Sequence, residues 1–89
     1  MDQSELADEL LDAIASQRDQ AIDSKNTWLS TMRNHLAAGD RDEAGRASTQ
    51  AEHYATAAQA LIVTLARCQQ IVSDREQTVA LVRAFGERA

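Results

Sequence analysis

The sequence predicts an all-α fold, a long antiparallel helical hairpin of the coiled-coil kind. Its 89 residues include 17 alanines, three glycines and no proline, and alanine is the strongest helix former. Val, Ile and Thr are sparse and form no alternating runs typical of a strand. One break near Gly39 divides the chain, and a heptad repeat of apolar residues follows it. These features predict two helices in a single domain, 1–89.

The first helix is predicted over about residues 3–38. Its apolar residues keep an approximate helical spacing; they are Leu6, Leu10, Leu11, Ile14, Ala21, Ile22, Trp28, Leu29, Met32 and Leu36. A polar stretch, residues 16–27, interrupts them. Ser24, Asn26 or Thr27 offers a cap for a new helix there, but nothing in the stretch forces a break. We therefore favour one helix, with a break near 24–27 as the alternative.

The turn is predicted at residues 39–40. Gly39 can adopt the left-handed conformation that ends many helices. Asp40 with Glu43 three residues later forms a capping-box pattern, in which each side chain accepts from a free N–H at the new helix start. Asp42 adds negative charge in the first turn, where the helix dipole favours it. A second helix should therefore begin near Arg41.

The second helix is predicted over about residues 41–85, because a heptad runs through it. The a positions are Ala44, Ala51, Ala58, Leu65, Val72, Val79 and Gly86, and the d positions are Ala47, Tyr54, Leu61, Cys68, Arg75 and Val82. All but Arg75 are apolar or glycine, which is typical of a helix packed on another helix. A second capping-box pattern at residues 73–76 leaves an alternative, in which residues 73–89 fold back as a short third helix.

Folding the chain at Gly39–Asp40 sets one antiparallel register. Trp28 then lies opposite Ala51, so that a large side chain meets a small one. Asp12 lies opposite Arg67, and Glu5 or Asp8 lies close to Arg75, so acidic and basic ends meet. Size and charge thus predict the same pairing of the two helices.

Composition limits the classes of function. The net charge of −5 disfavours binding to nucleic acid or to an anionic membrane surface. The acidic N-terminus does not resemble a secretory signal, and no stretch approaches the roughly 20 apolar residues of a membrane span. With one cysteine, no internal disulfide is expected. We expect a cytoplasmic protein.

The sequence contains no convincing catalytic, cofactor or metal site. In the predicted register His35 and His53 do not meet, and Cys68 lies on the apolar stripe with no histidine beside it to activate it. Neither a nucleophile elbow nor a phosphate loop is present. We therefore expect a non-enzymatic protein without cofactors.

The second helix carries more apolar surface than one partner helix can cover. Ile62, Val63 and Ile71 lie off the stripe, and residues 79–85 extend beyond the first helix. Such surface usually marks a protein interface. The residues predicted to bind a partner are Leu61, Ile62, Val63, Leu65, Ile71, Val72, Val79, Val82 and Phe85. The favoured partner is a second copy, giving a homodimeric four-helix bundle, and another protein is the alternative.

Two resemblances accompany this interpretation. Trp28, Gly39-Asp40, Ala44 and Ala51 follow part of the tetratricopeptide spacing, but an array needs about three repeats. Residues 28–66, with "LAAG", an acidic turn and "AEHYATAAQALIVTL", resemble the small helical-hairpin co-chaperones of type III secretion needle subunits. That resemblance implies a short, cytoplasmic, non-enzymatic protein that binds a tetratricopeptide-type chaperone and keeps a needle subunit from polymerising.

A different class of function rests on the acidic N-terminal segment. Its residues are Asp2, Glu5, Asp8, Glu9 and Asp12, with no basic residue among positions 1–16. Such a face can mimic nucleic-acid phosphates, as in a phage or mobile-element protein that blocks a host factor. The simpler interpretation is a solvated face that pairs with Arg67 and Arg75.

Overall fold

The protein is a hairpin of two α-helices. The computed structural model describes residues 3–88, in which α1 spans Gln3–Ala37 and α2 spans Arg41–Arg88. The predicted all-α hairpin is confirmed, and α1 continues without interruption through residues 24–27. The predicted end of the second helix at 85 was three residues short. The alternative of a folded-back third helix was wrong, because α2 is continuous to Arg88.

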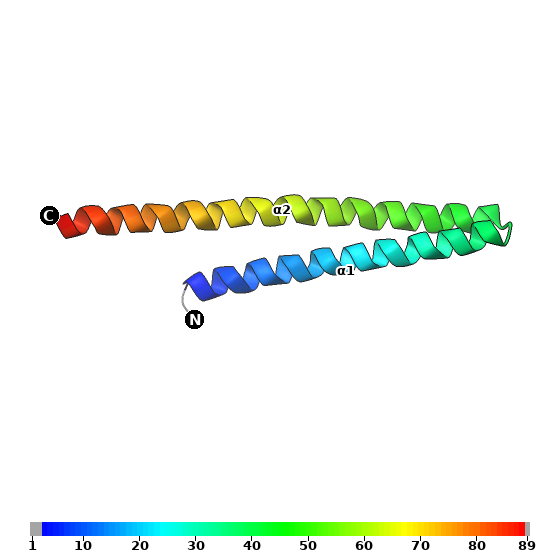
Figure 1. The fold of residues 1–89 in the computed structure, drawn as a ribbon, viewed down its shortest axis with the longest axis horizontal. Coiled ribbons are helices and arrows are strands. Elements are labelled where there is room, and N and C mark those ends of the chain that lie inside the picture. The colour runs from blue at the N-terminus through cyan, green and yellow to red at the C-terminus, as the bar shows by residue number, and fades with distance from the viewer. Residues whose placement is uncertain (1–2, 89) are drawn as a thin grey trace.

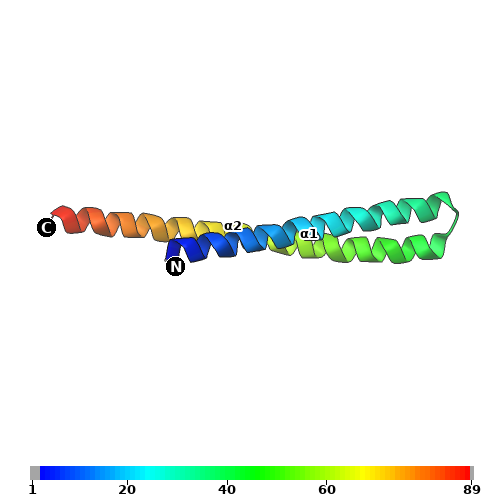
Figure 2. The ribbon, with the colours of Figure 1, turned by 90° about the horizontal axis from the view of Figure 1, so that it is seen from below.

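The molecule is a rod. Its extents are 76 × 21 × 13 Å, and its radius of gyration is 20.9 Å, whereas a compact domain of this length has ~12 Å. At about 1.5 Å per residue a helix as long as α2 spans roughly 72 Å, so α2 alone accounts for the long axis. Figures 1 and 2 show α1 running back along α2 from the turn and ending well before the C-terminal end of α2.

The turn is closed by a Schellman motif followed by an N-cap. Gly39 has φ of 79°, a left-handed conformation that costs other residues more than glycine. Its N–H donates to the Leu36 carbonyl at 3.1 Å, and the Asp40 N–H donates to the His35 carbonyl at 2.9 Å. These bonds satisfy carbonyls that the end of α1 would otherwise leave unpaired.

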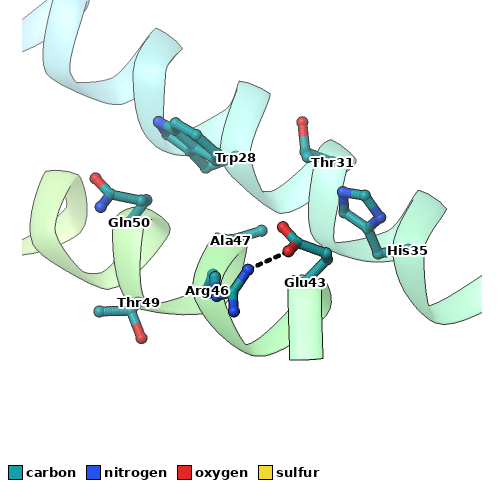
Figure 3. Close-up of a pocket in the computed structure, with 8 residues that line it drawn as sticks. All are labelled: Trp28, Thr31, His35, Glu43, Arg46, Ala47, Thr49 and Gln50. Atoms are coloured by element: carbon teal, nitrogen blue, oxygen red, sulfur yellow. Dashed lines mark hydrogen bonds and ion pairs between the residues drawn. The ribbon is translucent and has the colours of Figure 1, made fainter. Parts of the chain in front are cut away.

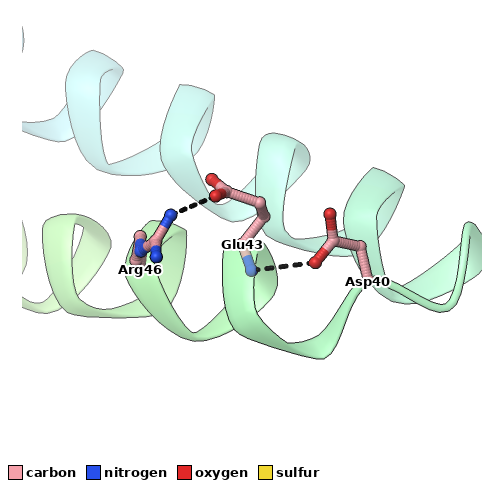
Figure 4. A network of polar contacts seen from close by, with 3 residues as sticks. All are labelled: Asp40, Glu43 and Arg46. Carbon is pink, nitrogen blue, oxygen red and sulfur yellow. Dashed lines mark hydrogen bonds and ion pairs between the residues drawn. The ribbon is translucent and has the colours of Figure 1, made fainter.

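The predicted capping box forms only in half (Figure 4). The Asp40 carboxylate accepts from the Glu43 N–H at 3.1 Å, as predicted. The Glu43 carboxylate does not return the bond to Asp40. It pairs with the Arg46 guanidinium, because the Asp40 N–H is already used by the Schellman motif.

The apolar stripe of α2 packs against α1 along most of its length. The buried residues are Ala21, Ala44, Ala47, Ala51, Ala58 and Leu65. Five of these six lie on the predicted stripe of α2, which confirms the heptad from Ala44 to Leu65. Farther along, Cys68 and Val72 are half-buried, and the stripe is exposed from Arg75 onward.

The inner face of α1 also follows a heptad, which the spacing of its apolar residues concealed. One row of its buried and half-buried positions runs at alternating intervals of four and three residues. The row consists of Ala7, Leu11, Ile14, Arg18, Ala21, Lys25, Trp28, Met32 and His35, and the half-buried Ala15, Ile22, Ser24, Leu29 and Thr31 border it. Leu6, Leu10 and Leu36, predicted within the apolar spacing, are exposed instead. Arg18 and Lys25 occupy the stripe because long aliphatic stems can lie on apolar surface while the charge reaches water.

Substitution by alanine is expected to change the free energy of unfolding in opposite directions at Gly39 and at Gly45. Gly39→Ala should lower the free energy of unfolding by about 1 kcal/mol, because alanine is strained at positive φ. Gly45→Ala should raise it by up to ~1 kcal/mol, because Gly45 lies inside α2 and a Cβ there meets nothing within 4 Å. Urea unfolding followed by circular dichroism measures both. Equal effects of the two substitutions would contradict the assigned turn.

The buried alanine row makes a second prediction. Ala58→Leu should destabilise the hairpin by about 1–3 kcal/mol, because the added carbons force the helices apart. Ala60→Leu is the matched control, since Ala60 is exposed on the same helix, and it should change stability by less than about 0.5 kcal/mol. If both variants unfold at the same urea concentration, Ala58 does not face α1.

Candidate functional site

The residues predicted to bind a partner divide into an interior and an exposed group. Leu65 is buried, and Leu61 and Val72 are half-buried on the stripe that faces α1. These three serve the hairpin itself. The exposed group, with 41–68% of each residue accessible, is Ile62, Val63, Ile71, Val79, Val82 and Phe85. Binding of a partner by these residues stays a prediction.

Three of the exposed residues, Val79, Val82 and Phe85, owe their exposure to the unequal lengths of the helices. The Arg75 guanidinium donates a hydrogen bond to the Gln3 side chain, so the start of α1 lies level with residue 75 of α2. Beyond that level α2 continues alone (Figures 1 and 2). Every residue from 73 to 86 is exposed. The apolar stripe therefore reaches Val79 and Val82 with no helix opposite it.

A hollow near the turn identifies which rows of the two helices share a flank (Figure 3). It has a volume of about 410 Å³ and is open to solvent. Thr31 of α1 and Gln50 of α2 both line it, beside Trp28 and Ala47. With Leu11 and Ala44 at a positions, Thr31 and Gln50 are both g residues. The g rows of α1 and α2 therefore run along the same flank of the hairpin.

The same flank is apolar at the open end of the hairpin. Leu10 lies three heptads from Thr31, and Ile71 lies three heptads from Gln50. Phe85 is two heptads beyond Ile71 in the same row. Leu6, at a c position of α1, borders the g row of α1, and Val82, at a d position of α2, borders the g row of α2. We call Leu6, Leu10, Ile71, Val82 and Phe85 the open-end patch; all five are 49–68% exposed.

Sequence reasoning missed Leu6 and Leu10 as candidate surface residues. It assigned them to the apolar spacing of the first helix because leucines are usually buried. The signal that separates them is heptad position, since each precedes by one residue an inner residue, Ala7 or Leu11. The heptad through Trp28 and Met32 would have placed both leucines outside the stripe.

The hollow agrees with the predicted register to within about one helical turn. Trp28 is half-buried and lies beside Ala47 and Gln50, which precede Ala51, its predicted opposite, by four residues and by one. Glu43 and Arg46 form an ion pair at the edge of the hollow (Figure 3). Thr31 donates its hydroxyl to the Thr27 carbonyl at 3.0 Å, within its own helix.

His35, His53 and Cys68 lie at separate places along the hairpin. His35 lines the hollow near the turn, whereas the His53 ring makes an edge-to-face contact with Tyr54 at 5.3 Å. Cys68 is half-buried on the stripe, as predicted. Among residues 3–88, no group of three or more His, Cys, Asp or Glu side chains is arranged to hold a metal ion.

The predicted ionic pairing between the helices is wrong at Asp12. Asp12 and Arg67 are both exposed and form no ion pair with each other. Asp2 lies outside the described residues, and Glu5, Asp8 and Glu9 are exposed like Asp12. Exposed ion pairs contribute little to stability, so packing of the alanine row, and not charge, sets the register.

Comparison with family models, with curated proteins and with solved structures found no match.

Within residues 3–88, neither helix contains an apolar stretch that could cross a membrane.

The division into interior and exposed residues predicts different effects of one substitution at two valines. Val72→Asp should lower the free energy of unfolding by about 1–3 kcal/mol, because it places a charge between the helices. Val82→Asp should change it by less than about 0.5 kcal/mol, because Val82 is 65% exposed. Urea unfolding at low micromolar concentration separates the two. A large loss for Val82→Asp would mean that the end of α2 supports the hairpin.

Proposed function

We propose that this protein is a non-enzymatic interaction module, a small cytoplasmic adaptor or co-chaperone that acts by packing helix surface against another protein. The observation that carries the proposal is the end of α2, which projects past α1 with Val79, Leu81, Val82 and Phe85 exposed. Covering a large apolar side chain gains about 1.5–3 kcal/mol relative to leaving it in water. A contiguous apolar surface of this kind usually binds protein.

The proposed mechanism is burial of an amphipathic helix. Residues 79, 82 and 85 follow one another at intervals of three, a spacing that places them on one side of the helix, as helix-in-groove binding requires. The segment is already helical as a continuation of α2, so binding would not require it to fold first. Preformed structure reduces the entropy lost on association. Two occupants fit this mechanism, a second copy of the chain or a different protein.

The resemblance to needle-subunit co-chaperones belongs to the same class of function. It gives one particular partner to test, a tetratricopeptide-type chaperone. The rival class, an acidic inhibitor that mimics nucleic acid, draws on the exposed carboxylates of Asp8, Glu9 and Asp12. The two classes place the binding residues at different positions, which allows one set of variants to separate them.

The test compares two doubly substituted chains. Val82→Asp with Phe85→Asp places two charges on the apolar side of the α2 end. Gln77→Asp with Ala84→Asp adds the same residues at f positions, on the outward side. The first variant should weaken association at least tenfold, because charges in an apolar interface are costly, and the control should not. Light scattering over a concentration series, and affinity capture with the intact chain as bait, measure association.

Two outcomes would reject the proposal. One is that both double variants associate as the unmodified chain does in both assays. The other is that Asp8→Asn with Asp12→Asn abolishes association while the α2 variants retain it, which would support the acidic inhibitor instead. Circular dichroism on every variant confirms that helicity is retained.

A further inference from the structure

The open-end patch is arranged to pair with itself. Along the g row of α2, Ile71, Thr78 and Phe85 follow at intervals of seven residues, and Thr78 is the midpoint. If two copies lie antiparallel with Thr78 on a two-fold axis, Phe85 of each chain reaches Ile71 of the other. Residues of a two-fold interface must pair in this reciprocal way. Phe85 and Ile71 are 68% and 66% exposed.

The contact would extend to α1 of the other copy. Leu10 shares its flank with Ile71 and is exposed, and Leu6 lies one turn away from Leu10. The end of one α2 would therefore lie over the N-terminal part of α1 and over Ile71 of the second chain. Each chain supplies the helix end that the other lacks, because α2 continues past the level at which α1 begins (Figure 1).

Charge favours this flank over the others for contact between copies. Each chain carries a net charge of −5, so two copies repel unless their acidic residues face apart. The g row of α1 is uncharged; its residues are Gln3, Leu10, Gln17, Ser24 and Thr31. The g row of α2 is uncharged from Gln50 to Phe85. The acidic residues of α1 lie in the b, e and f rows, away from this flank.

The available area is sufficient for a dimer. Seven large apolar side chains are exposed at the open end: Leu6, Leu10, Ile71, Val79, Leu81, Val82 and Phe85. Half-exposed side chains of this size offer on the order of 100 Å² each, or roughly 700 Å² in total, close to the ~800 Å² per partner of a standard interface. The other exposed large residues, Leu36, Ile62 and Val63, lie outside this end and cannot add to the same contact.

We propose that two copies of this chain associate through their open ends, in an antiparallel two-fold arrangement with Phe85 of one copy against Ile71 and Leu10 of the other. This inference rests on the proposed function and names its partner as a second copy. The two α2 helices overlap at the centre, the end of each α2 lies beside the start of α1 in the other copy, and the two turns point outward. The dimer is therefore a longer rod, not a side-by-side bundle of the length of one hairpin.

The first test is cysteine crosslinking on the two-fold axis. In a Cys68→Ala background, Thr78→Cys should give a disulfide-linked dimer on mild oxidation, because facing helices bring such residues within disulfide reach. Gln77→Cys is the matched control, adjacent in sequence and on the outward f row, and should give at least tenfold less. Equal crosslinking at 77 and 78, or none at 78, would overturn the arrangement.

The second test is solution shape. Thr78 lies 38 residues from Asp40, so two hairpins joined at Thr78 should give a maximum dimension of roughly 115 Å at about 1.5 Å per residue. Small-angle scattering measures this, with the mass taken from light scattering on the same sample. A dimer no longer than the 76 Å of one chain, or a chain that stays monomeric at high micromolar concentration, would overturn the inference.

Charge substitutions link this inference to the proposed function and separate their failures. Ile71→Asp and Phe85→Asp should each weaken the dimer at least tenfold, whereas Gln69→Asp, on the e row, should not. A monomeric chain whose α2 end still captures another protein rejects the self-pairing and leaves the proposed function standing. Two results together would reject both the self-pairing and the proposed function. They are an unmodified chain that stays monomeric, and a Val82→Asp with Phe85→Asp chain that still binds every partner of the unmodified chain.

Discussion

The packing of α1 onto a row of alanines is the interaction on which the rest of the structure depends. Among residues 3–86, five of the six buried residues are alanines, and no large side chain is fully buried. Each alanine removes little apolar surface from water, so no short segment of this hairpin is stable by itself. Stability must instead accumulate along the row, which requires long helices. The rod shape follows from the small size of the residues that hold it together.

The same constraint separates the two ends of the molecule. Near the turn, small residues on α2 lie opposite large ones on α1, such as Trp28 and Met32, and Ala44, Ala47 and Ala51 are buried. Toward the open end, α2 carries Leu, Val and Ile in place of alanine. There α1 ends, so that it no longer covers α2. The residues with the greatest capacity for apolar contact therefore have the least intramolecular cover. A chain that served only its own stability would place them near the turn.

The sequence was sufficient to predict the hairpin, its turn and the approximate register. Gly39 and Asp40 mark a helix end and a helix start, and the heptad of α2 is nearly free of polar residues. The inner face of α1 was not recognised, because Arg18 and Lys25 occupy the stripe while Leu6 and Leu10 lie outside it. The prediction for α1 was based on which residues are apolar, whereas burial in the structure depends on heptad position.

The candidate site was predicted in part, for a related reason. Val82 and Phe85 were identified because the second helix extends beyond the first, and Ile71 because it lies off the apolar stripe. Leu61, Leu65 and Val72 were also assigned to a partner, but α1 covers them. A sequence shows that a stripe is apolar without showing which helix covers each part of it. The Asp12–Arg67 pairing failed because exposed side chains gain too little from pairing to dictate geometry.

The turn also determines the order in which the hairpin can assemble. Residues beside Gly39–Asp40 are separated by few residues along the chain, so their pairing closes a short loop at little entropic cost. Each further layer then closes onto a paired neighbour, as in a zipper. Gln3 and Arg75 pair last, across 72 residues of chain, and should be the first to open in hydrogen exchange. The end of the molecule that carries the open-end patch is thus also its least protected end, and a partner bound there would slow the unzipping of the whole rod.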